Sequence, residues 1–257
     1  MDGWIDTHAH IYLKEFDVDR YTVLQHCQDL SVSRIYMPNI DHTSIDAMLE
    51  VELKYPDQCV AMMGLHPCSV KKDFEQELYR VEEWLSKRKF IAIGEMGTDL
   101  YWDKTYWPQQ QEAFKIQIGW AKHYQLPVVI HCRESIEETI ELLTPLADET
   151  LKGVFHCFSG TLEQARKIMD MGFFLGFGGV ATFKNGGMDK VLPALNQEHL
   201  VLETDSPFLA PVPYRGKRNT PEYIPLIAQK VADLKHLSLV ELKKITTHNA
   251  MRLFNDL

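Results

Sequence analysis

The sequence is poor in cysteine, and its cysteines do not occur in pairs. Five are present in 257 residues, none of them in a CxxC motif: Cys27, Cys59, Cys68, Cys132 and Cys157. An odd number without close pairs is typical of reduced thiols and argues against a disulfide framework.

Long apolar runs, repeats and linkers are absent as well. No apolar stretch approaches the ~20 residues that span a membrane, and the N-terminus lacks a basic segment followed by an apolar one. No low-complexity or Pro/Gly/Ser-rich segment divides the chain, whose 45% hydrophobic content is sufficient for one large core. These features predict one domain over residues 1–257 in a soluble cytoplasmic protein that does not bind membranes, and we expect a monomer.

Six side chains that can bind a metal stand where short apolar runs end. They are His8, His10, Glu95, His131, His156 and Asp205. Residues two apart share one face of an extended strand, so His8 and His10 can reach one cation. By itself this pair fits two hydrogen-bonded histidines at a strand end equally well. The whole set favours a metal site.

Short apolar runs alternate with segments of helical periodicity, which is typical of an α/β fold with a parallel sheet. Helices are predicted at Gln109–Tyr124, Thr220–Leu234 and Leu239–Phe254, the last with a capping pattern at Ser238 and Glu241. Strands are predicted near residues 3–8, 34–39, 59–65, 90–94, 127–131, 153–156, 173–177 and 199–204.

This number of strands in ~250 residues predicts a TIM (β/α)8-like barrel. The alternative is a doubly wound open sheet, which would not gather residues from the first, fourth, fifth, sixth and eighth strands around one point. A closed barrel places the ends of all its strands around one site, where catalytic residues of such barrels lie.

The charge balance limits the substrates. The chain has 36 acidic and 27 basic residues, a net charge of −9, which argues against broad binding of duplex DNA but allows a short anion in a local basic pocket. Such barrels often bind phosphate near their last loops. Arg133, two residues after His131, and the later Arg215, Lys217 and Arg218 are therefore predicted phosphate contacts, although the last three also fit solvated loop charges.

Four further residues stand close to predicted metal ligands in the chain or at the end of a predicted strand. Glu203 should share the strand face of Asp205 and orient a metal ligand or the attacking water beside the substrate, a supporting role rather than a catalytic one. His66 is predicted to contact a substrate phosphate or to bind metal weakly, and its alternative is a hydrogen-bonded polar residue beside the pocket. Cys132 and Cys157 each follow a predicted histidine ligand, so strand alternation should turn them away from the site to pack.

A series of short motifs runs in order along nearly the whole chain: Ile5–His10, Gly64–Pro67, Ile93–Glu95, Gln110–Phe114, Pro127–Arg133, His156–Gly160, Leu202–Pro207, Leu209–Pro211, Arg215–Asn219 and Asn249–Arg252. With these motifs the sequence resembles the TatD-type metal-dependent deoxyribonucleases of the amidohydrolase-like metal hydrolases. The resemblance implies a TIM-like barrel and the hydrolysis of phosphodiesters, often as a 3′-to-5′ exonuclease on single-stranded DNA.

The resemblance also implies two metal ions. His8, His10, Glu95 and Asp205 would bind one, and the bridging Glu95 would bind the second together with His131 and His156. The sequence departs from the family after Glu95, where relatives show Gly-Leu-Asp and an aromatic residue and this chain has Gly97-Thr-Asp-Leu-Tyr101. Tyr101 or Trp102 is a candidate for stacking on a base, and loop packing is the alternative.

Two cations about 3.5–4 Å apart can polarise a phosphoryl oxygen, activate water and stabilise the developing charge. Asp205 would be both ligand and general base, and Glu95 the catalytic bridge. We expect two divalent cations, Mg²⁺, Mn²⁺ or Zn²⁺. The first alternative is a hydrolase of a small amide, ester or lactone, or of an aminoacyl ester on RNA, and the second is a metal-dependent binding module without catalysis.

Overall fold

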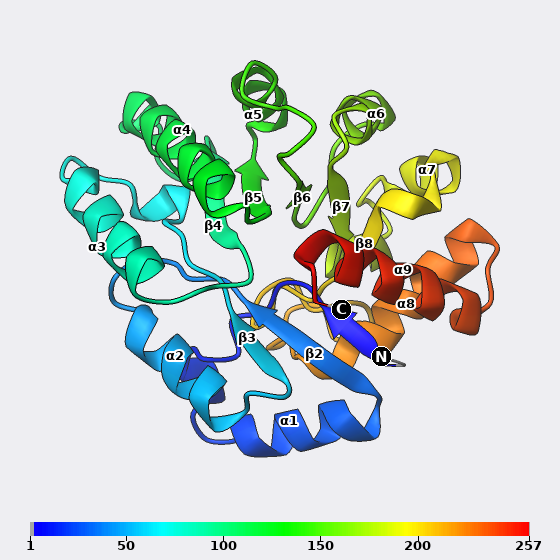
Figure 1. The fold of residues 1–257 in the computed structure, drawn as a ribbon. Helices are drawn as coiled ribbons and strands as arrows, with labels where there is room; N and C mark the ends of the chain where they lie inside the picture. Colours follow the sequence, from blue (N-terminus) through cyan, green and yellow to red (C-terminus); the bar gives the residue numbers. More distant parts are fainter. Residues whose placement is uncertain (1–2, 257) are drawn as a thin grey trace.

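The computed structural model describes residues 3–256. In Figure 1, strands in the middle of the molecule are surrounded by helices that follow them in the chain. The strands of the described chain are β1 (Trp4–Asp6), β2 (Val32–Met37), β3 (Cys59–Ala61), β4 (Ile93–Asp99), β5 (Val128–Arg133), β6 (Gly153–Phe155), β7 (Phe174–Phe177) and β8 (Leu200–Leu202). The helices are α1 (Arg20–Asp29), α2 (Ile45–Lys54), α3 (Phe74–Lys87), α4 (Trp107–Tyr124), α5 (Ile136–Leu143), α6 (Leu162–Asp170), α7 (Met188–Val191), α8 (Ile224–Lys235) and α9 (Leu239–Phe254).

All strand pairs are parallel, and they form two sheets with the orders β1-β2-β3 and β4-β5-β6-β7-β8. Short contacts join the two sheets on both sides. A bridge between Met63 and Ile93 connects the end of β3 to β4. A second bridge, between Ala9 and Ser206, connects the segments that follow β1 and β8. The arrangement is the predicted TIM-like barrel.

Alternate strand residues face two separate parts of the core. In β5, Val128 and Ile130 belong to the large cluster that includes the buried faces of the surrounding helices. Val129 belongs instead to a second cluster, with Val154 of β6, Val201 of β8 and the last turn of α9. Neighbouring side chains of a strand point to opposite faces, so the second cluster lies inside the ring of strands. Because these apolar side chains fill the inside of the ring, the site lies at the carboxyl ends of the strands.

The predicted elements occur in the predicted order, and most strand boundaries and the boundaries of two helices are shifted by one to several residues. Helix α8 begins at Ile224 instead of Thr220, because Pro221–Tyr223 forms a 3-10 turn before it. Helix α9 has the predicted bounds, and Ser238 and Glu241 form its capping box. No helix within residues 3–256 is both long enough and apolar enough to cross a membrane.

The larger difference is in β4, which we expected to end at residue 94. It continues to Asp99 because its second half pairs with β5, with Gly97 opposite His131 and Asp99 opposite Arg133. Gly97 has a φ of 148°, and a Cβ atom at this position would collide with the carbonyl oxygen of His131. A glycine is therefore required for this close pairing. Glu95 consequently lies inside a strand and not just beyond its end.

Candidate metal centre

A cavity of about 1200 Å³ lies at the carboxyl ends of the strands. It is lined by metal-capable side chains, basic side chains and an apolar wall that includes Phe183, Phe208 and Leu209. The predicted metal ligands in the lining are His10, Glu95, His131, His156 and Asp205. His8 is completely buried beside them.

The ends of β1 and β8 are held together by backbone and side-chain hydrogen bonds. The amide of Asp205 donates to the carbonyl of His8 over 2.8 Å. The amide and hydroxyl of Thr204 donate to the carboxylate of the buried Asp6, over 2.9 and 2.6 Å. These contacts place Asp205 beside the His8–His10 pair, although almost two hundred residues separate them in the chain.

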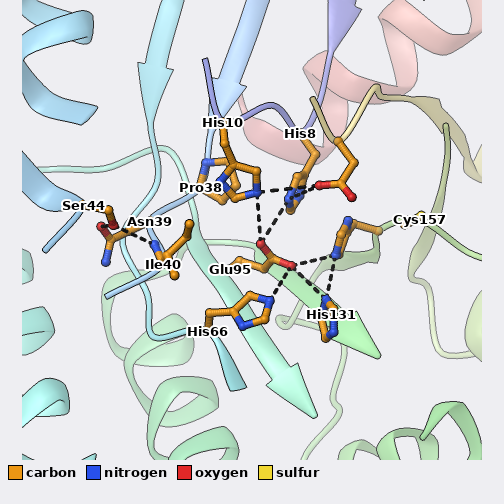
Figure 2. Close-up of polar contacts among 12 residues, drawn as sticks. His8, His10, Pro38, Asn39, Ile40, Ser44, His66, Glu95, His131 and Cys157 are labelled. Atoms are coloured by element: carbon orange, nitrogen blue, oxygen red, sulfur yellow. Dashed lines mark hydrogen bonds and ion pairs between the residues drawn. The ribbon is translucent and has the colours of Figure 1, made fainter. Parts of the chain in front are cut away.

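Glu95 stands at the centre of the predicted ligands, and its two oxygens face different histidines (Figure 2). Oε2 lies 3.2 Å from His8 Nε2 and 3.5 Å from His10 Nε2. Oε1 lies 2.8 Å from His156 Nε2 and 3.0 Å from His131 Nδ1. A carboxylate with one oxygen toward each pair has the arrangement needed to bridge two cations.

The electrostatics of the cluster keep Glu95 ionised. Burial alone would raise the pKa of its carboxyl group, but the surrounding histidines lower this pKa well below the ordinary value. Burial and the stacked ring of His156, whose centroid is 3.9 Å away, lower the pKa of His8 well below its ordinary value. His8 is therefore a neutral imidazole, the form that binds metals.

The donor set fits divalent metal ions. Three groups bring their ligand atoms within 4.8 Å of one another: His8 with His10 and Glu95, His8 with His156 and Asp205, and His66 with Glu95 and His131. Among the residues described, neither ring nitrogen of the buried His8 has a hydrogen-bond partner. Buried polar atoms are rarely left unpaired, and a bound cation would satisfy them. Imidazole and carboxylate ligands suit Zn²⁺ and Mn²⁺, and carboxylates also suit Mg²⁺.

Asp99 belongs to this centre and was missed in the sequence. Its Oδ2 accepts a hydrogen bond from His131 Nε2 over 2.9 Å, which leaves Nδ1 of that ring for a metal. Its Oδ1 accepts from the amides of Tyr101 and Trp102, over 2.9 and 3.0 Å. Burial raises the pKa of Asp99, but these hydrogen bonds lower it to about 2. The alternation Glu95, Gly97, Asp99 would have revealed it had β4 been predicted at its full length.

His66 also lines the cavity, with its Nε2 3.4 Å from Glu95 Oε1. Its Nδ1 accepts a hydrogen bond from the amide of Cys68 over 3.0 Å. The proton of the neutral ring must therefore be on Nε2, which makes His66 a hydrogen-bond donor in the cavity.

Of the four arginine and lysine residues predicted to contact phosphate, three line the cavity and one does not. Arg133, Arg215 and Lys217 are part of the lining. Arg218 lies outside the cavity lining formed by the described residues, and its guanidinium binds both carboxylate oxygens of Asp19, over 2.9 and 2.6 Å. This bidentate ion pair is partly buried, and Asp19 and Arg218 are 199 positions apart in the chain. Only the tertiary structure separates the role of Arg218 from those of its neighbours.

The aromatic residues after β4 lie at the rim. The guanidinium carbon of Arg133 is 3.8 Å from the centroid of the Tyr101 ring and 5.3 Å from that of Trp102. Trp102 lines the cavity and is 68% exposed. Tyr101 is 47% exposed, packs on Arg133 and is not among the described residues that line the cavity. Trp102 is thus the better placed of the two to contact a ligand.

Glu203 and the two cysteines differ from the sequence predictions in position. Glu203 is fully buried behind the site, where it accepts a hydrogen bond from the amide of Cys157 and lies 3.6 Å from His156 Nδ1. It faces a predicted ligand instead of the cavity. Cys132 and Cys157 were predicted to turn away from the site and pack, but both line the cavity, and only Cys132 also packs against the large core cluster. Cys157 lies beyond the end of β6 with a φ of 48°, where strand alternation does not apply.

The chain is similar to known metal-dependent hydrolases. The family model for the TatD-related DNases matches residues 5–255. YabD of Bacillus subtilis (strain 168), described as an uncharacterized metal-dependent hydrolase, is 40% identical over 250 residues, 97% of this chain and 98% of that protein. YcfH of Escherichia coli (strain K12), described in the same words, is 35% identical over 202 residues, 77% of this chain and 75% of that protein.

The fold is also similar to that of a solved TatD homolog. The crystal structure of YjjV, a TatD homolog from Escherichia coli K12, superimposes with a TM-score of 0.92 at 29% sequence identity and covers 98% of both chains. The similarity therefore extends over the barrel and over every strand that carries a predicted ligand. The chain belongs to the TatD-related DNase family and is a metal-dependent hydrolase.

Proposed function

We propose that this hydrolase is a deoxyribonuclease that removes nucleotides from the 3′ ends of single-stranded DNA with the help of two divalent metal ions. The observation that carries the proposal is the position of Glu95, whose two oxygens face separate pairs of histidines at the base of a cavity rimmed by basic side chains. Such a bridged pair of cations suits the in-line displacement of a phosphodiester.

Each cation would have its own set of ligands. His8, His10, Glu95 and Asp205 would hold one, and the second would be held by Glu95 together with two more histidines, His131 and His156. When bound, the cations supply Lewis acidity, which lowers the pKa of water and neutralises charge on the phosphate. The protein keeps them in place by burying the rings and by hydrogen bonds to the outer nitrogens, as Asp99 does for His131.

Asp205 is the general base of the proposal. In the metal-free site, burial raises the pKa of its carboxyl group to about 6. A carboxylate within hydrogen-bond reach of the attacking water is a suitable general base. Its Oδ1 is 3.7 Å from Nε2 of both His8 and His10, so it would act beside the first cation. Its side chain keeps a 13% exposed fraction on the cavity side, which leaves it accessible to water.

The basic rim would bind the phosphates of the substrate. Arg133, Arg215 and Lys217 line the same cavity as the carboxylates that would hold the cations, so basic groups are available beside the metal centre. Two guanidinium groups can each bind a phosphate through two parallel hydrogen bonds. The Nε2–H of His66 is a further donor to a phosphate oxygen near Glu95.

The exposed ring of Trp102 would stack on a base of the substrate. Arg133 packs against the neighbouring Tyr101, which holds the rim aromatics in place. Stacking of a base on an aromatic ring contributes about 1–3 kcal/mol and tolerates any base, as an exonuclease on single strands requires.

The test is cleavage of a short single-stranded oligonucleotide labelled at either end, after metal removal and titration with Mg²⁺, Mn²⁺ or Zn²⁺. We expect a metal-dependent ladder that starts from the 3′ end and disappears in Asp205→Asn. The control is Arg218→Ala, which changes a basic residue outside the cavity lining. Absence of cleavage with every metal, in a protein that binds metal, would overturn the proposal.

The alternative is hydrolysis of a carbonyl substrate, such as a small amide, ester or lactone, or an aminoacyl ester on RNA. The apolar wall of the cavity, with Phe183, Phe208 and Leu209, favours this alternative because it would suit an acyl group. Release of product from a panel of such substrates, without cleavage of DNA, would select it.

A further inference from the structure

The hydroxyl of Tyr12 makes two short contacts beside the metal centre. It lies 2.9 Å from Nδ1 of His10 and 2.6 Å from the carbonyl oxygen of Pro38. Tyr12 is 2% exposed, and His10 is 3% exposed. The three residues come from the segments that follow β1 and β2, and Figure 2 shows Pro38 next to His10. These contacts therefore form a buried hydrogen-bonded series from the backbone carbonyl of Pro38, through Tyr12, to the predicted metal ligand His10.

The chemistry of the chain allows only one distribution of protons. A carbonyl oxygen can only accept, so the single proton of the Tyr12 hydroxyl must be donated to Pro38. Without that proton, two oxygen atoms 2.6 Å apart would oppose their lone pairs. The hydroxyl must consequently accept from His10, and Nδ1 of His10 must carry the ring proton. The other ring nitrogen of a neutral imidazole, Nε2, then has a free lone pair.

That free nitrogen points into the metal centre. Nε2 of His10 is 3.5 Å from Glu95 Oε2 and 3.7 Å from Asp205 Oδ1, the two carboxylates predicted to share a cation with it. In the opposite tautomer, Nε2 would carry a proton and would be unable to bind a metal. Rotation of the ring would also prevent metal binding, because it would turn Nε2 away from the two carboxylates. The contact between Nδ1 and the Tyr12 hydroxyl opposes this rotation.

We propose that Tyr12 is a positioning residue that holds His10 in the tautomer and orientation able to bind a metal ion. The proposal rests on the metal centre of the proposed function but is independent of its substrate. Hydrogen bonds to the outer nitrogen of a histidine ligand typically change metal affinity by about 10- to 100-fold when removed. The hydroxyl, and not the ring, is responsible, because only the hydroxyl links His10 to Pro38.

The test compares Tyr12→Phe with Tyr36→Phe. Both variants remove one hydroxyl from a buried tyrosine, but that of Tyr36 donates to Asp256 and not to a residue of the metal centre. Binding of Mn²⁺ and of Zn²⁺ is measured by calorimetry on the metal-free full chain. We expect Tyr12→Phe to bind at least one ion about 10- to 100-fold more weakly than the wild type, and Tyr36→Phe to bind like the wild type. Wild-type affinity in Tyr12→Phe would overturn the proposal, as would an equal loss in both variants.

A second measurement uses the wild-type protein and does not depend on how the variants fold. Nitrogen NMR of ¹⁵N-histidine-labelled, metal-free protein at alkaline pH, where imidazoles are neutral, shows which ring nitrogen carries the proton. The His10 signals are assigned by their loss in His10→Gln. A proton on Nδ1 supports the inference, and a proton on Nε2 contradicts it. Failure of the proposed function is a separate result, because it would appear as normal metal binding without cleavage of DNA.

Discussion

His131 Nε2 donates a hydrogen bond to Asp99 Oδ2 over 2.9 Å, while Nδ1 of the same ring faces Glu95 Oε1 at 3.0 Å. The carboxylate can only accept, so the contact places the ring proton on Nε2 and leaves Nδ1 for a metal. Asp99→Ala should therefore weaken metal binding by about 10- to 100-fold. Calorimetric titration with Zn²⁺ measures this.

Asp99→Asn is the matched comparison for that prediction, because its amide has one oxygen, which can replace either Oδ2 toward His131 or Oδ1 toward the loop amides, but not both. With its oxygen toward His131, it should bind metal more tightly than Asp99→Ala and no more tightly than the wild type. Equal affinity of Asp99→Ala and the wild type would show that Asp99 does not orient His131.

Asp205→Asn and Glu95→Gln should each abolish hydrolysis without unfolding the protein. The first removes the proposed base and a ligand charge, and the second removes the bridge between the two sets of histidines. We expect losses of at least roughly 10²- to 10⁴-fold in kcat/KM. Hydrolysis rates are measured, and circular dichroism of the same samples shows whether each variant is folded. Wild-type rates in either folded variant would exclude that residue from catalysis.

Removal of metal should lower the thermal stability. A ligand that binds only the folded state at 100 times its Kd stabilises that state by about 2.7 kcal/mol, which corresponds to roughly 5–10 °C in Tm for a chain of this size. The buried, unpaired nitrogens of His8 are the physical source of the effect. Differential scanning fluorimetry with and without a chelator measures it, and an unchanged Tm in a protein saturated with metal would contradict it.

The stability of the metal-free protein against unfolding and its affinity for metal should depend on pH in opposite directions. Burial lowers the pKa of His131 and of His156, but the nearby carboxylates raise both above the ordinary 6.5. Imidazolium is thus favoured in the folded state, and the stability that this contributes is lost as pH rises above 6.5 through the folded pKa values. Burial raises the pKa of Asp6 from 3.8 to about 8, so the stability contributed by its protonated form is lost as pH rises from 3.8 to about 8.

Metal must displace the protons of the two histidines, so metal affinity should rise with pH while the stability of the metal-free protein falls. Urea unfolding of the metal-free protein and calorimetry in buffers of different ionisation enthalpy measure the two trends. Metal binding without proton release near neutral pH would show that the rings are already neutral.

Arg215→Ala and Arg218→Ala should have different effects, although only two residues lie between the altered positions. Arg215 lines the cavity, whereas Arg218 is paired with Asp19. Loss of a charged phosphate contact should raise KM for DNA about tenfold, equivalent to about 1.4 kcal/mol, and reduce the dependence of KM on salt. Arg218→Ala should leave KM unchanged. Equal effects of the two substitutions would contradict this assignment.

The sequence alone was enough to predict the barrel and the metal-capable residues. Apolar runs of strand length separated by helical periodicity determine the order of the elements, because each must bury its apolar face. A parallel barrel then brings the carboxyl ends of its strands together, and this places both His8 and His156 beside Glu95. These are local patterns combined with one general rule of topology.

The tertiary structure decided the partner of each polar group. Strand β4 extends to Asp99 because β5 pairs with it, and Gly97 permits this close approach. Arg218 is held by Asp19, and Tyr12 joins His10 to Pro38. Hydrogen bonds between residues far apart in the chain depend on distances of a few tenths of an ångström, which no pattern of residue types contains. The sequence therefore determined which metal-capable residues stand at the strand ends, and the fold determined which other side chains reach the site and which ring nitrogens, carboxylates and guanidinium groups are free to act there.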